Sequence, residues 1–355
     1  MKILEITRSY YPSIGGLEKF ILQRTKIYRQ LNIDFHIIAS DYSSEKTDNS
    51  LKYDNVTVLK QFTKYNFVFG LKKDFFLSYD FIFINQIGNF LSDRSIFIAS
   101  GLNKKIILTP HLYFHTNDFS LLKSIHKKYI TPMLLKRVDK IICFTNYEKE
   151  YWSTNFYVPA EKLVVIPHYF KQEMQKKLNF IPAPRKFLLY LGRNYKNKRI
   201  DLLITAFTRM KQLTFDLYLT ASLRDFNPGL KRLITKDGRI KLLDYISESD
   251  KHKLLSACTA LILPTDNEAF GSVCLEGAGF EKPLLCSNLP VLREINDKDG
   301  VIFFDNNLLS IKNALEKLDS LTDQKLKTMG LINYNNLKKY EFEKILRMYE
   351  VILKY

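Results

Sequence analysis

Two glutamates, Glu268 and Glu276, flank the start of a predicted helix that follows a predicted strand. Glu276 lies within the apolar run 273–278, where a carboxylate without partners costs free energy. Carboxylates are bidentate acceptors that match vicinal hydroxyls on a sugar ring or a ribose. We therefore interpret the pair as ligands for a hydroxyl-rich substrate. The alternative is two ordinary glutamates on a solvated helix.

Two further segments at predicted strand ends suit an anion. Gly271 and Ser272 would expose backbone N–H groups at a helix N-terminus, where a phosphate can bind. Residues 193–199 carry four cations, and among these Arg193 and Lys198 could bind a diphosphate without a metal ion. A solvated basic loop is the alternative.

The paired glycines Gly15 and Gly16, after the first predicted strand, form a third such turn. Glycine lets the backbone approach an anion closely, and the helix N-terminus adds a positive partial charge. A purely structural turn would need glycine as well, so both interpretations stay open. The segment is not a GxGxxG pattern, which disfavours a dehydrogenase, and no DxD or other metal-ligand cluster occurs near these loops.

Short β-branched and aromatic runs alternate with helix-length amphipathic segments along the chain, which predicts βαβ units and parallel sheets. The alternation breaks at 171–185, a polar stretch with two prolines, so we expect a linker there. It would join two Rossmann-like domains, 1–170 and 186–335, and a C-terminal helix, 336–355, would pack on the first domain. The predicted strands are Lys2–Thr7, Asp34–Ala39, Val56–Leu59, Phe81–Asn85, Lys105–Thr109, Lys140–Phe144, Leu163–Ile166, Lys186–Leu191, Phe215–Thr220, Ile240–Leu243, Thr259–Leu263, Pro283–Cys286 and Val301–Phe304.

The composition narrows the class of protein. A chain of 355 residues with 46% hydrophobic residues fits two folded domains. The net charge of +17 favours anionic ligands or surfaces. Acidic Glu5 in the first apolar run argues against a signal peptide, and no apolar stretch reaches the roughly 18 residues of a membrane-spanning helix. We therefore expect a cytoplasmic protein.

Two segments, 60–76 and 119–140, interleave lysines with aromatic or aliphatic residues. Basic amphipathic segments of this kind suit an anionic membrane surface. We expect peripheral docking of the first domain at the cytoplasmic face of a membrane. The alternative is a set of core aromatics beside solvated lysines.

Taken in their order along the chain, these motifs resemble those of family 4 retaining glycosyltransferases, which share the pattern E-x7-E. The resemblance implies the GT-B fold, in which two tandem Rossmann-like domains face each other across a cleft. It also implies sugar transfer from a nucleotide-diphosphate sugar to a glycan or lipid-linked acceptor, with retention of configuration and with no metal or other cofactor. The segments that carry the resemblance are Tyr11–Glu18, Val138–Thr145, Tyr190–Phe207, Glu268–Glu276 and Lys282–Ser287.

The same resemblance implies roles for individual residues. Glu276 would hold the donor ribose, and Glu268 would contact hydroxyls of the transferred sugar as a catalytic residue. The second catalytic residue would be His111, in the loop after 105–109, with His115 as the other candidate. The implied donor-binding residues are Gly16, Arg193, Lys198, Tyr245 near the base, Gly271, Ser272 and Glu276.

The chain departs from the family pattern at three places. Residues 165–170 lack its asparagine and glycine, Gly277 replaces the usual alanine, and Glu281 stands where glycine is frequent. Rival hypotheses are a nucleotide-sugar epimerase or phosphorylase on the same fold, a catalytically inactive sugar-binding relative, and a basic nucleic-acid-binding protein. The last has no recognisable nucleic-acid-binding signature, so we expect no nucleic-acid partner.

Overall fold

Runs of buried apolar residues form one hydrophobic core in each half of the chain.

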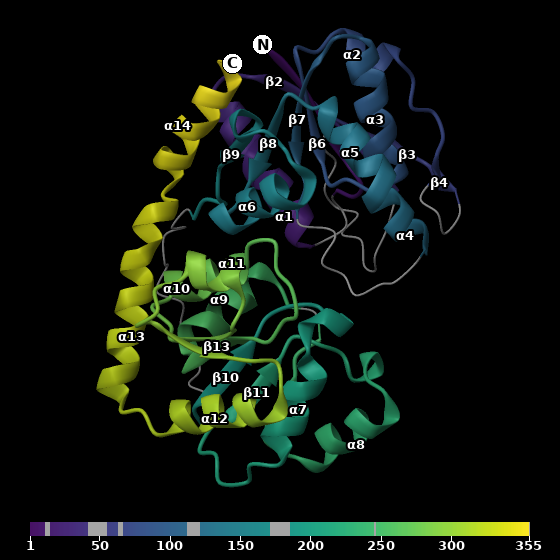
Figure 1. Cartoon of the computed structure of the whole chain (residues 1–355). Helices are drawn as coiled ribbons and strands as arrows, with labels where there is room; N and C mark the ends of the chain where they lie inside the picture. Colours follow the sequence, from purple (N-terminus) through teal and green to yellow (C-terminus); the bar gives the residue numbers. More distant parts are fainter. Residues whose placement is uncertain are drawn as a thin grey trace. The chain divides into compact units, whose positions relative to one another are not determined.

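The computed structural model describes residues 1–10, 15–41, 55–62, 67–111, 121–170, 185–244 and 246–354 (Figure 1). The chain divides into two compact units, Met1–Tyr169 with Glu343–Tyr355, and Phe170–Phe342. None of the helices in the described ranges is long and apolar enough to cross a lipid bilayer.

The first unit is built on a seven-stranded parallel sheet in the order β3-β2-β1-β6-β7-β8-β9. Strands β1 and β6 are buried along almost their whole length, as expected where helices cover both faces of a parallel sheet. The strands are β1 (Lys2–Thr7), β2 (Asp34–Ser40), β3 (Val56–Leu59), β6 (Phe81–Asn85), β7 (Lys105–Thr109), β8 (Lys140–Cys143) and β9 (Leu163–Val165).

Capped helices connect these strands. The side chains of Asn89 and Thr145 accept backbone N–H groups at the starts of α3 and α6, which satisfies donors that a helix leaves free. Helix α3 packs on β1, β6 and β7, and α6 packs on β8 and β9. The helices are α1 (Gly16–Gln30), α2 (Asp74–Leu77), α3 (Phe90–Gly101), α4 (Leu121–Ile125), η2 (His126–Ile130), α5 (Thr131–Lys136), α6 (Asn146–Phe156) and η3 (Ala160–Lys162).

The second unit has a six-stranded parallel sheet in the order β12-β11-β10-β13-β14-β15. Its strands are β10 (Phe187–Tyr190), β11 (Asp216–Leu219), β12 (Ile240–Leu242), β13 (Ala260–Leu263), β14 (Leu284–Ser287) and β15 (Val301–Phe304). Its helices are η4 (Lys196–Lys198), α7 (Ile200–Thr208), η5 (Leu223–Asp225), α8 (Pro228–Lys236), α9 (Glu248–Ala257), α10 (Ser272–Gly279), α11 (Pro290–Ile295), α12 (Leu308–Asp319), α13 (Asp323–Asn336) and η6 (Leu337–Tyr340).

The predicted α/β class with two parallel sheets is confirmed. Every predicted strand is present, with ends that agree to within one residue. The structure also contains an antiparallel pair that was not predicted, β4 (Gln61–Phe62) with β5 (Phe67–Val68), because two-residue strands leave no periodic pattern. The predicted linker, 171–185, lies outside the described residues except for its last position.

The C-terminal helix, predicted to begin at residue 336, begins at Phe342 as α14 (Phe342–Leu353). The reason is local: α13 ends in the short helix η6, and Glu341 adopts φ −59° and ψ 139°, which interrupts the helix. Its residues from Glu343 onward belong to the first unit. The buried residues of α14, spaced three and four apart, form one apolar stripe: Ile345, Leu346, Tyr349, Ile352 and Leu353.

Candidate functional site

In the second unit, Lys198 and Glu268 form an ion pair between two strand-end loops. The Lys198 Nζ donates to Glu268 Oε1, and the two side chains are only 20% and 14% exposed. Lys198 ends η4, after β10, and Glu268 follows β13, the neighbouring strand in the sheet. Two residues predicted to act on one ligand are therefore in contact, and their enclosure strengthens the field of each charge.

Neighbouring residues hold the two loops together. Asp266 N–H donates to the Asn197 carbonyl oxygen (2.7 Å), and Asn197 Nδ2 donates to Asn267 Oδ1 (2.8 Å). The Arg199 guanidinium lies 3.2 Å from an Asp266 carboxylate oxygen. These contacts fix the backbone on both sides of the Lys198–Glu268 pair, so its geometry is set by the fold.

Arg193 precedes this pair on the loop after β10. Its Nη1 donates to the Tyr195 hydroxyl (2.8 Å), and its backbone carbonyl accepts from the Tyr190 hydroxyl (3.0 Å). The structure thus joins Lys198 to Glu268, whereas the polar contacts described for Arg193 are with the tyrosines of its own loop. The Arg193 side chain is partly buried.

Glu276, on α10, is paired with a second lysine. The Lys251 Nζ lies 3.1 Å from Glu276 Oε1 and 2.6 Å from Glu248 Oε2. Lys251 is 8% exposed, and the Glu276 side chain is 28% exposed. Sequence reasoning missed Lys251. The spacing of Glu248 and Lys251 was readable as an i,i+3 pair, but the contact with α10 requires the packed structure.

The start of α10 requires glycine. Gly271 has φ +84°, and a Cβ there would lie 2.7 Å from Leu292 Cδ2, so any other residue would strain the backbone and displace Leu292. Ser272 is the first helical residue after it. The departure at Gly277 is also explained, because a Cβ would lie 3.0 Å from Leu284 Cδ2 and 3.5 Å from Leu261 Cβ. Tyr245 lies outside the described residues.

In the first unit, Gly16 is the first residue of α1. Its φ is not in the left-handed region, and a Cβ there would meet no described atom within 4 Å. Neither backbone strain nor packing against the described residues accounts for this glycine. The prediction that its N–H approaches an anion therefore stands, untested, beside the alternative of a structural turn.

His111 follows β7 in a strained conformation. Its φ is +57°, a region that non-glycine residues rarely occupy and that often marks functional positions. Its ring meets the rings of Phe20 and Phe144 edge-on, each at 5.1 Å between centroids. Burial, the neighbouring His168 and the Arg24 guanidinium lower the pKa of His111 well below its usual range, so the imidazole is neutral at physiological pH. His115 lies outside the described residues.

Close to His111, a charged pair is buried between strand β1 and helix α1. Glu5 on β1 is 0% exposed and Arg24 on α1 is 1% exposed, and they form an ion pair. Arg24 also donates to Thr109 Oγ1 (3.0 Å) and Asn85 Oδ1 (2.6 Å), and the Tyr28 hydroxyl donates to Glu5 Oε2 (2.7 Å). Burial opposes the charge of Arg24, but Glu5 outweighs it and raises the pKa of the guanidinium.

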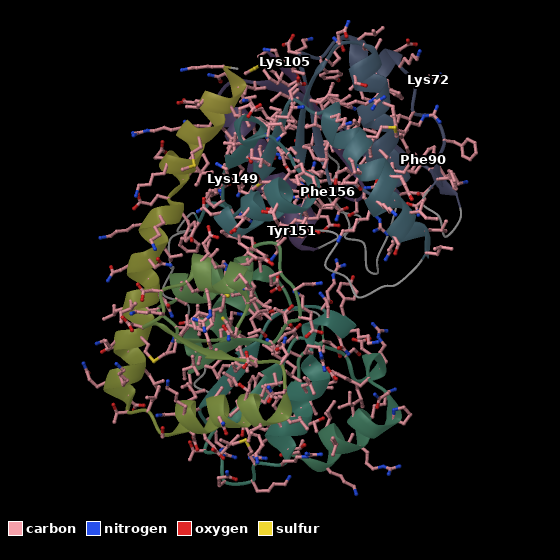
Figure 2. The ribbon with its side chains drawn as sticks, viewed as in Figure 1. Lys72, Phe90, Lys105, Lys149, Tyr151 and Phe156 are labelled. Atoms are coloured by element: carbon pink, nitrogen blue, oxygen red, sulfur yellow. The ribbon has the colours of Figure 1, made fainter. Side chains whose placement is uncertain are left out.

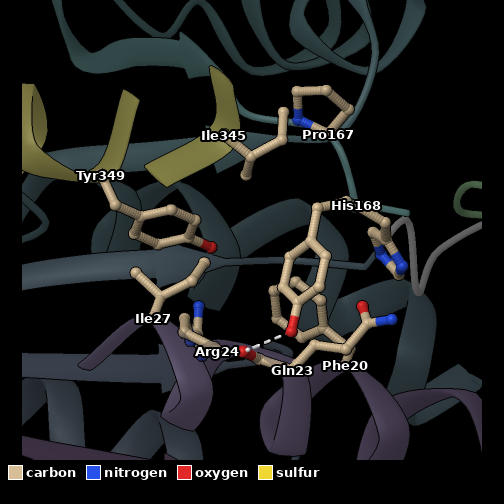
Figure 3. Close-up of a pocket in the computed structure, with 9 residues that line it drawn as sticks. Phe20, Gln23, Arg24, Ile27, Pro167, His168, Ile345 and Tyr349 are labelled. Atoms are coloured by element: carbon tan, nitrogen blue, oxygen red, sulfur yellow. Dashed lines mark hydrogen bonds between the residues drawn. The ribbon is translucent and has the colours of Figure 1, made fainter. Parts of the chain in front are cut away.

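Helix α14 covers the same region. Figure 3 shows Arg24 on α1 and Tyr349 on α14 lining one small hollow with Phe20, His168 and Ile345. Burial raises the pKa of the Tyr349 hydroxyl, and the positive charge of Arg24 opposes this shift. Sequence reasoning used Glu5 only to argue against a leader segment. The signal that it missed was a pair of opposite charges, one in an apolar strand and one in the buried face of a helix.

Two family models match the chain in succession. Residues 14–170 match the model described as Glycosyltransferase Family 4, and residues 171–340 match Glycosyl transferases group 1. The chain is 25% identical to an uncharacterized glycosyltransferase of Methanocaldococcus jannaschii, over 97% of this chain and 95% of that protein. It is 20% identical to the GDP-mannose:cellobiosyl-diphosphopolyprenol alpha-mannosyltransferase of Komagataeibacter xylinus, over 99% of this chain and 94% of that protein.

Among solved structures, the Anabaena protein HepE in complex with UDP and glucose superposes with a TM-score of 0.78. The alignment covers 100% of this chain and 99% of that one, at 17% sequence identity. This likeness concerns the fold, and it agrees with the two parallel-sheet units and with the order of the motifs along the chain.

Proposed function

Because this chain is a family 4 glycosyltransferase with the GT-B fold, we propose that it transfers a sugar from a nucleotide diphosphate to a lipid-linked or other glycan acceptor. The transfer proceeds with retention of configuration and without a metal ion. The observation that carries the proposal is the enclosed contact of Lys198 with Glu268, beside the helix start at Gly271 and Ser272.

The proposed donor site lies in the second unit. Lys198 and Arg193 stabilise the leaving diphosphate, helped by backbone N–H groups at the start of α10, in the manner of preorganised electrostatic catalysis. Glu268 accepts hydrogen bonds from hydroxyls of the sugar. Its contact with Lys198 means that both groups are already oriented before the donor arrives, which reduces the reorganisation that the reaction requires.

Glu276 binds the ribose through its carboxylate in this proposal. Its Oε1 already faces Lys251, so the lysine orients the carboxylate. The ribose hydroxyls then donate to a fixed acceptor, and a charged acceptor gives a stronger hydrogen bond than a neutral one. Lys251 is a supporting residue here, and Glu276 makes the contact with the ligand.

A nucleotide diphosphate donor is supported by the relatives. One relative's name specifies GDP-mannose as donor and a diphosphopolyprenol-linked cellobiose as acceptor, and HepE has been solved with UDP. We propose the same two classes for this chain, a nucleoside diphosphate sugar and a polyprenol-linked glycan.

Thermal shifts with UDP, GDP, ADP and their sugars identify the donor, since a ligand that binds the folded state raises the melting temperature. Transfer is then measured on the polyprenol-linked acceptor with and without EDTA, and product NMR gives the anomeric configuration. A donor altered in the absence of acceptor would indicate an epimerase. Loss of transfer in EDTA, or an inverted product, would contradict the corresponding part of the proposal.

We also propose that the segment Leu121–Lys136 docks on an anionic membrane surface. Apolar side chains in its first part are exposed, Leu121 by 75%, Leu122 by 66% and Tyr129 by 60%, whereas Leu134 and Leu135 are buried in the core. Lys123, Lys127 and Lys128 alternate with the exposed side chains, so the successive helices α4 and η2 combine apolar side chains for insertion with positive charges that attract anionic headgroups.

The other predicted segment, 60–76, divides into two parts. Phe76 is fully buried, so there the alternative of a core aromatic is correct. Phe67 and Phe69 are 47% and 67% exposed, and the ring of Phe67 lies 4.8 Å from that of Phe90, which Figure 2 labels together with Lys72.

Sedimentation with phosphatidylglycerol vesicles tests the docking proposal. A Leu121→Ser/Leu122→Ser variant is expected to lose most binding, and high salt is expected to weaken binding of the unmodified protein. The matched control is Leu309→Ser, since Leu309 is 67% exposed on α12 of the second unit. Equal sedimentation of all three proteins, or indifference to salt, would refute it.

A further inference from the structure

Asn85, at the end of β6, lies between the buried charged pair and His111. Its Nδ2 donates to Glu5 Oε1 and to the Ile6 carbonyl oxygen (2.9 Å), and its Oδ1 accepts from Arg24 Nη2 (2.6 Å). A carboxylate and a carbonyl can only accept here, and a guanidinium can only donate. The orientation of the Asn85 amide is therefore determined by its partners.

His111 meets this fixed amide at its oxygen. The His111 Nε2 lies 3.4 Å from Asn85 Oδ1, at the long end of the hydrogen-bonding range. An amide oxygen cannot donate, so the hydrogen of the contact must belong to His111 Nε2. In a neutral imidazole the lone pair then resides on Nδ1.

The groups that face His111 favour the neutral ring. Arg24 on α1 carries a positive charge, His168 follows β9, and the rings of Phe20 and Phe144 also pack against His111. The buried carboxylate of Glu5 pairs with Arg24 and accepts hydrogen bonds from Asn85 and Tyr28. These contacts offset its negative charge, so Glu5 has little electrostatic effect on His111.

We propose that Asn85 is a positioning residue, which, backed by Glu5 and Arg24, fixes His111 as the neutral Nε2–H tautomer so that Nδ1 presents its lone pair to a hydroxyl of a bound sugar. This inference rests on the proposed sugar transfer. The tautomer itself does not depend on it, because every contact that fixes the tautomer lies within the first unit.

A neutral imidazole with its lone pair on Nδ1 can accept a hydrogen bond but carries no charge. It cannot neutralise the leaving diphosphate, a task that falls to Arg193 and Lys198. It orients one hydroxyl of the sugar. This hydrogen bond is expected to stabilise the transition state of transfer more than the bound substrate. Loss of Asn85 is therefore expected to lower kcat more than it raises the KM for the donor.

The test is ¹⁵N NMR of the histidine side chains in the full chain. The chain contains six histidines, and a His111→Asn variant assigns the His111 signals by difference. The unmodified protein is expected to show the Nε2–H tautomer from pH 6 to pH 8. An Nδ1–H or protonated ring in the unmodified protein would overturn the proposal without any mutation at Asn85.

Variants at Asn85 test whether the tautomer of His111 affects the rate of sugar transfer. Asn85→Ala is expected to give a mixture of tautomers and to lower kcat about tenfold or more, while Asn85→Ser, which keeps a small polar group, recovers part of both. Tyr157→Phe is the matched control, since Tyr157 is 86% exposed in the first unit and lies outside the Glu5–Arg24–Asn85 contacts, so it should leave the tautomer and kcat unchanged. An unchanged tautomer in folded Asn85→Ala refutes the positioning role.

Failure of this inference and failure of the proposed function give different results. If the unmodified protein shows the Nε2–H tautomer but transfers no sugar from any nucleotide, the proposed function is wrong and the tautomer assignment stands. If transfer is normal and His111 shows the other tautomer, the positioning role is wrong and the function stands.

Discussion

Each unit of this glycosyltransferase contains an ion pair among its candidate functional residues, Glu5 with Arg24 in the first unit and Lys198 with Glu268 in the second. The two pairs differ in their exposure to solvent. Glu5 and Arg24 are sealed inside the first unit, where hydrogen bonds engage both charges. Lys198 and Glu268 retain 20% and 14% of their side-chain exposure in the second unit. The sealed pair can orient neighbours but cannot bind a ligand, whereas the partly exposed pair can exchange its partners for those of a substrate.

The largest expected effect is on stability, when Arg24 of the sealed pair is replaced. An Arg24→Met variant leaves the Glu5 carboxylate buried without its counter-ion, and we expect the free energy of unfolding to fall by about 3–5 kcal/mol. Urea unfolding followed by circular dichroism measures the change. Lys26→Met, at an exposed position of the same helix, is the control and should change stability by less than about 0.5 kcal/mol. A similar small change for Arg24→Met would show that the sealed pair does not hold the unit together.

At the partly exposed pair, the expected effect is on catalysis. A Glu268→Gln variant keeps the shape of the side chain but removes its charge, so it should lower kcat about 100-fold or more. Its stability should fall less than that of Arg24→Met, because the pair in the second unit keeps some contact with water whereas the Glu5–Arg24 pair has none. Steady-state transfer and thermal unfolding measure the two quantities. Glu316→Gln, on an exposed position of α12, is the control, and unchanged turnover in Glu268→Gln would reject the catalytic role.

The polar interior of the first unit is expected to be sensitive to acid. Burial and Arg24 lower the pKa of His168 to about 3, against about 6.5 in an unfolded chain. Between these values the unfolded chain binds the extra proton, so stability falls as the pH decreases below about 6.5. From pH 7 to pH 5 this histidine alone should cost about 2 kcal/mol.

Urea unfolding at several pH values checks this prediction. His168→Gln should reduce the pH dependence over that interval by about 2 kcal/mol, with His111 contributing the remainder, whereas His252→Gln, in the second unit, should leave it unchanged. A pH dependence of His168→Gln that matches the unmodified protein would contradict the assignment to His168.

The smallest expected effects concern the second lysine–glutamate contact. Glu276→Ala should weaken nucleotide binding about tenfold or more, because hydrogen bonds to a charged group are lost. Lys251→Met removes only the residue that orients Glu276, so its effect should be about threefold. Isothermal titration with the identified nucleotide measures both. If Lys251→Met weakened binding as much as Glu276→Ala, Lys251 would be a direct ligand.

Much of the fold was predictable because strands leave local patterns. Runs such as Phe81–Asn85 and Ala260–Leu263 are continuous, apolar and short, which is typical of strands buried on both faces. The interruption of the C-terminal helix at Glu341 was not predictable, since the residue there has no strong helix-breaking property and the turn before it depends on packing.

The sequence by itself determined the order of the strands along the chain, the glycine that opens α10, and the motifs that identify the family. Only the tertiary structure decided which charges meet: Lys198 and Glu268 are 70 positions apart, and Arg24 and Asn85 are 61 apart. Periodicity and propensity describe neighbours within a helix or strand. Pairing between distant segments depends on the order of strands in the sheet, and it therefore becomes visible only when the chain is folded.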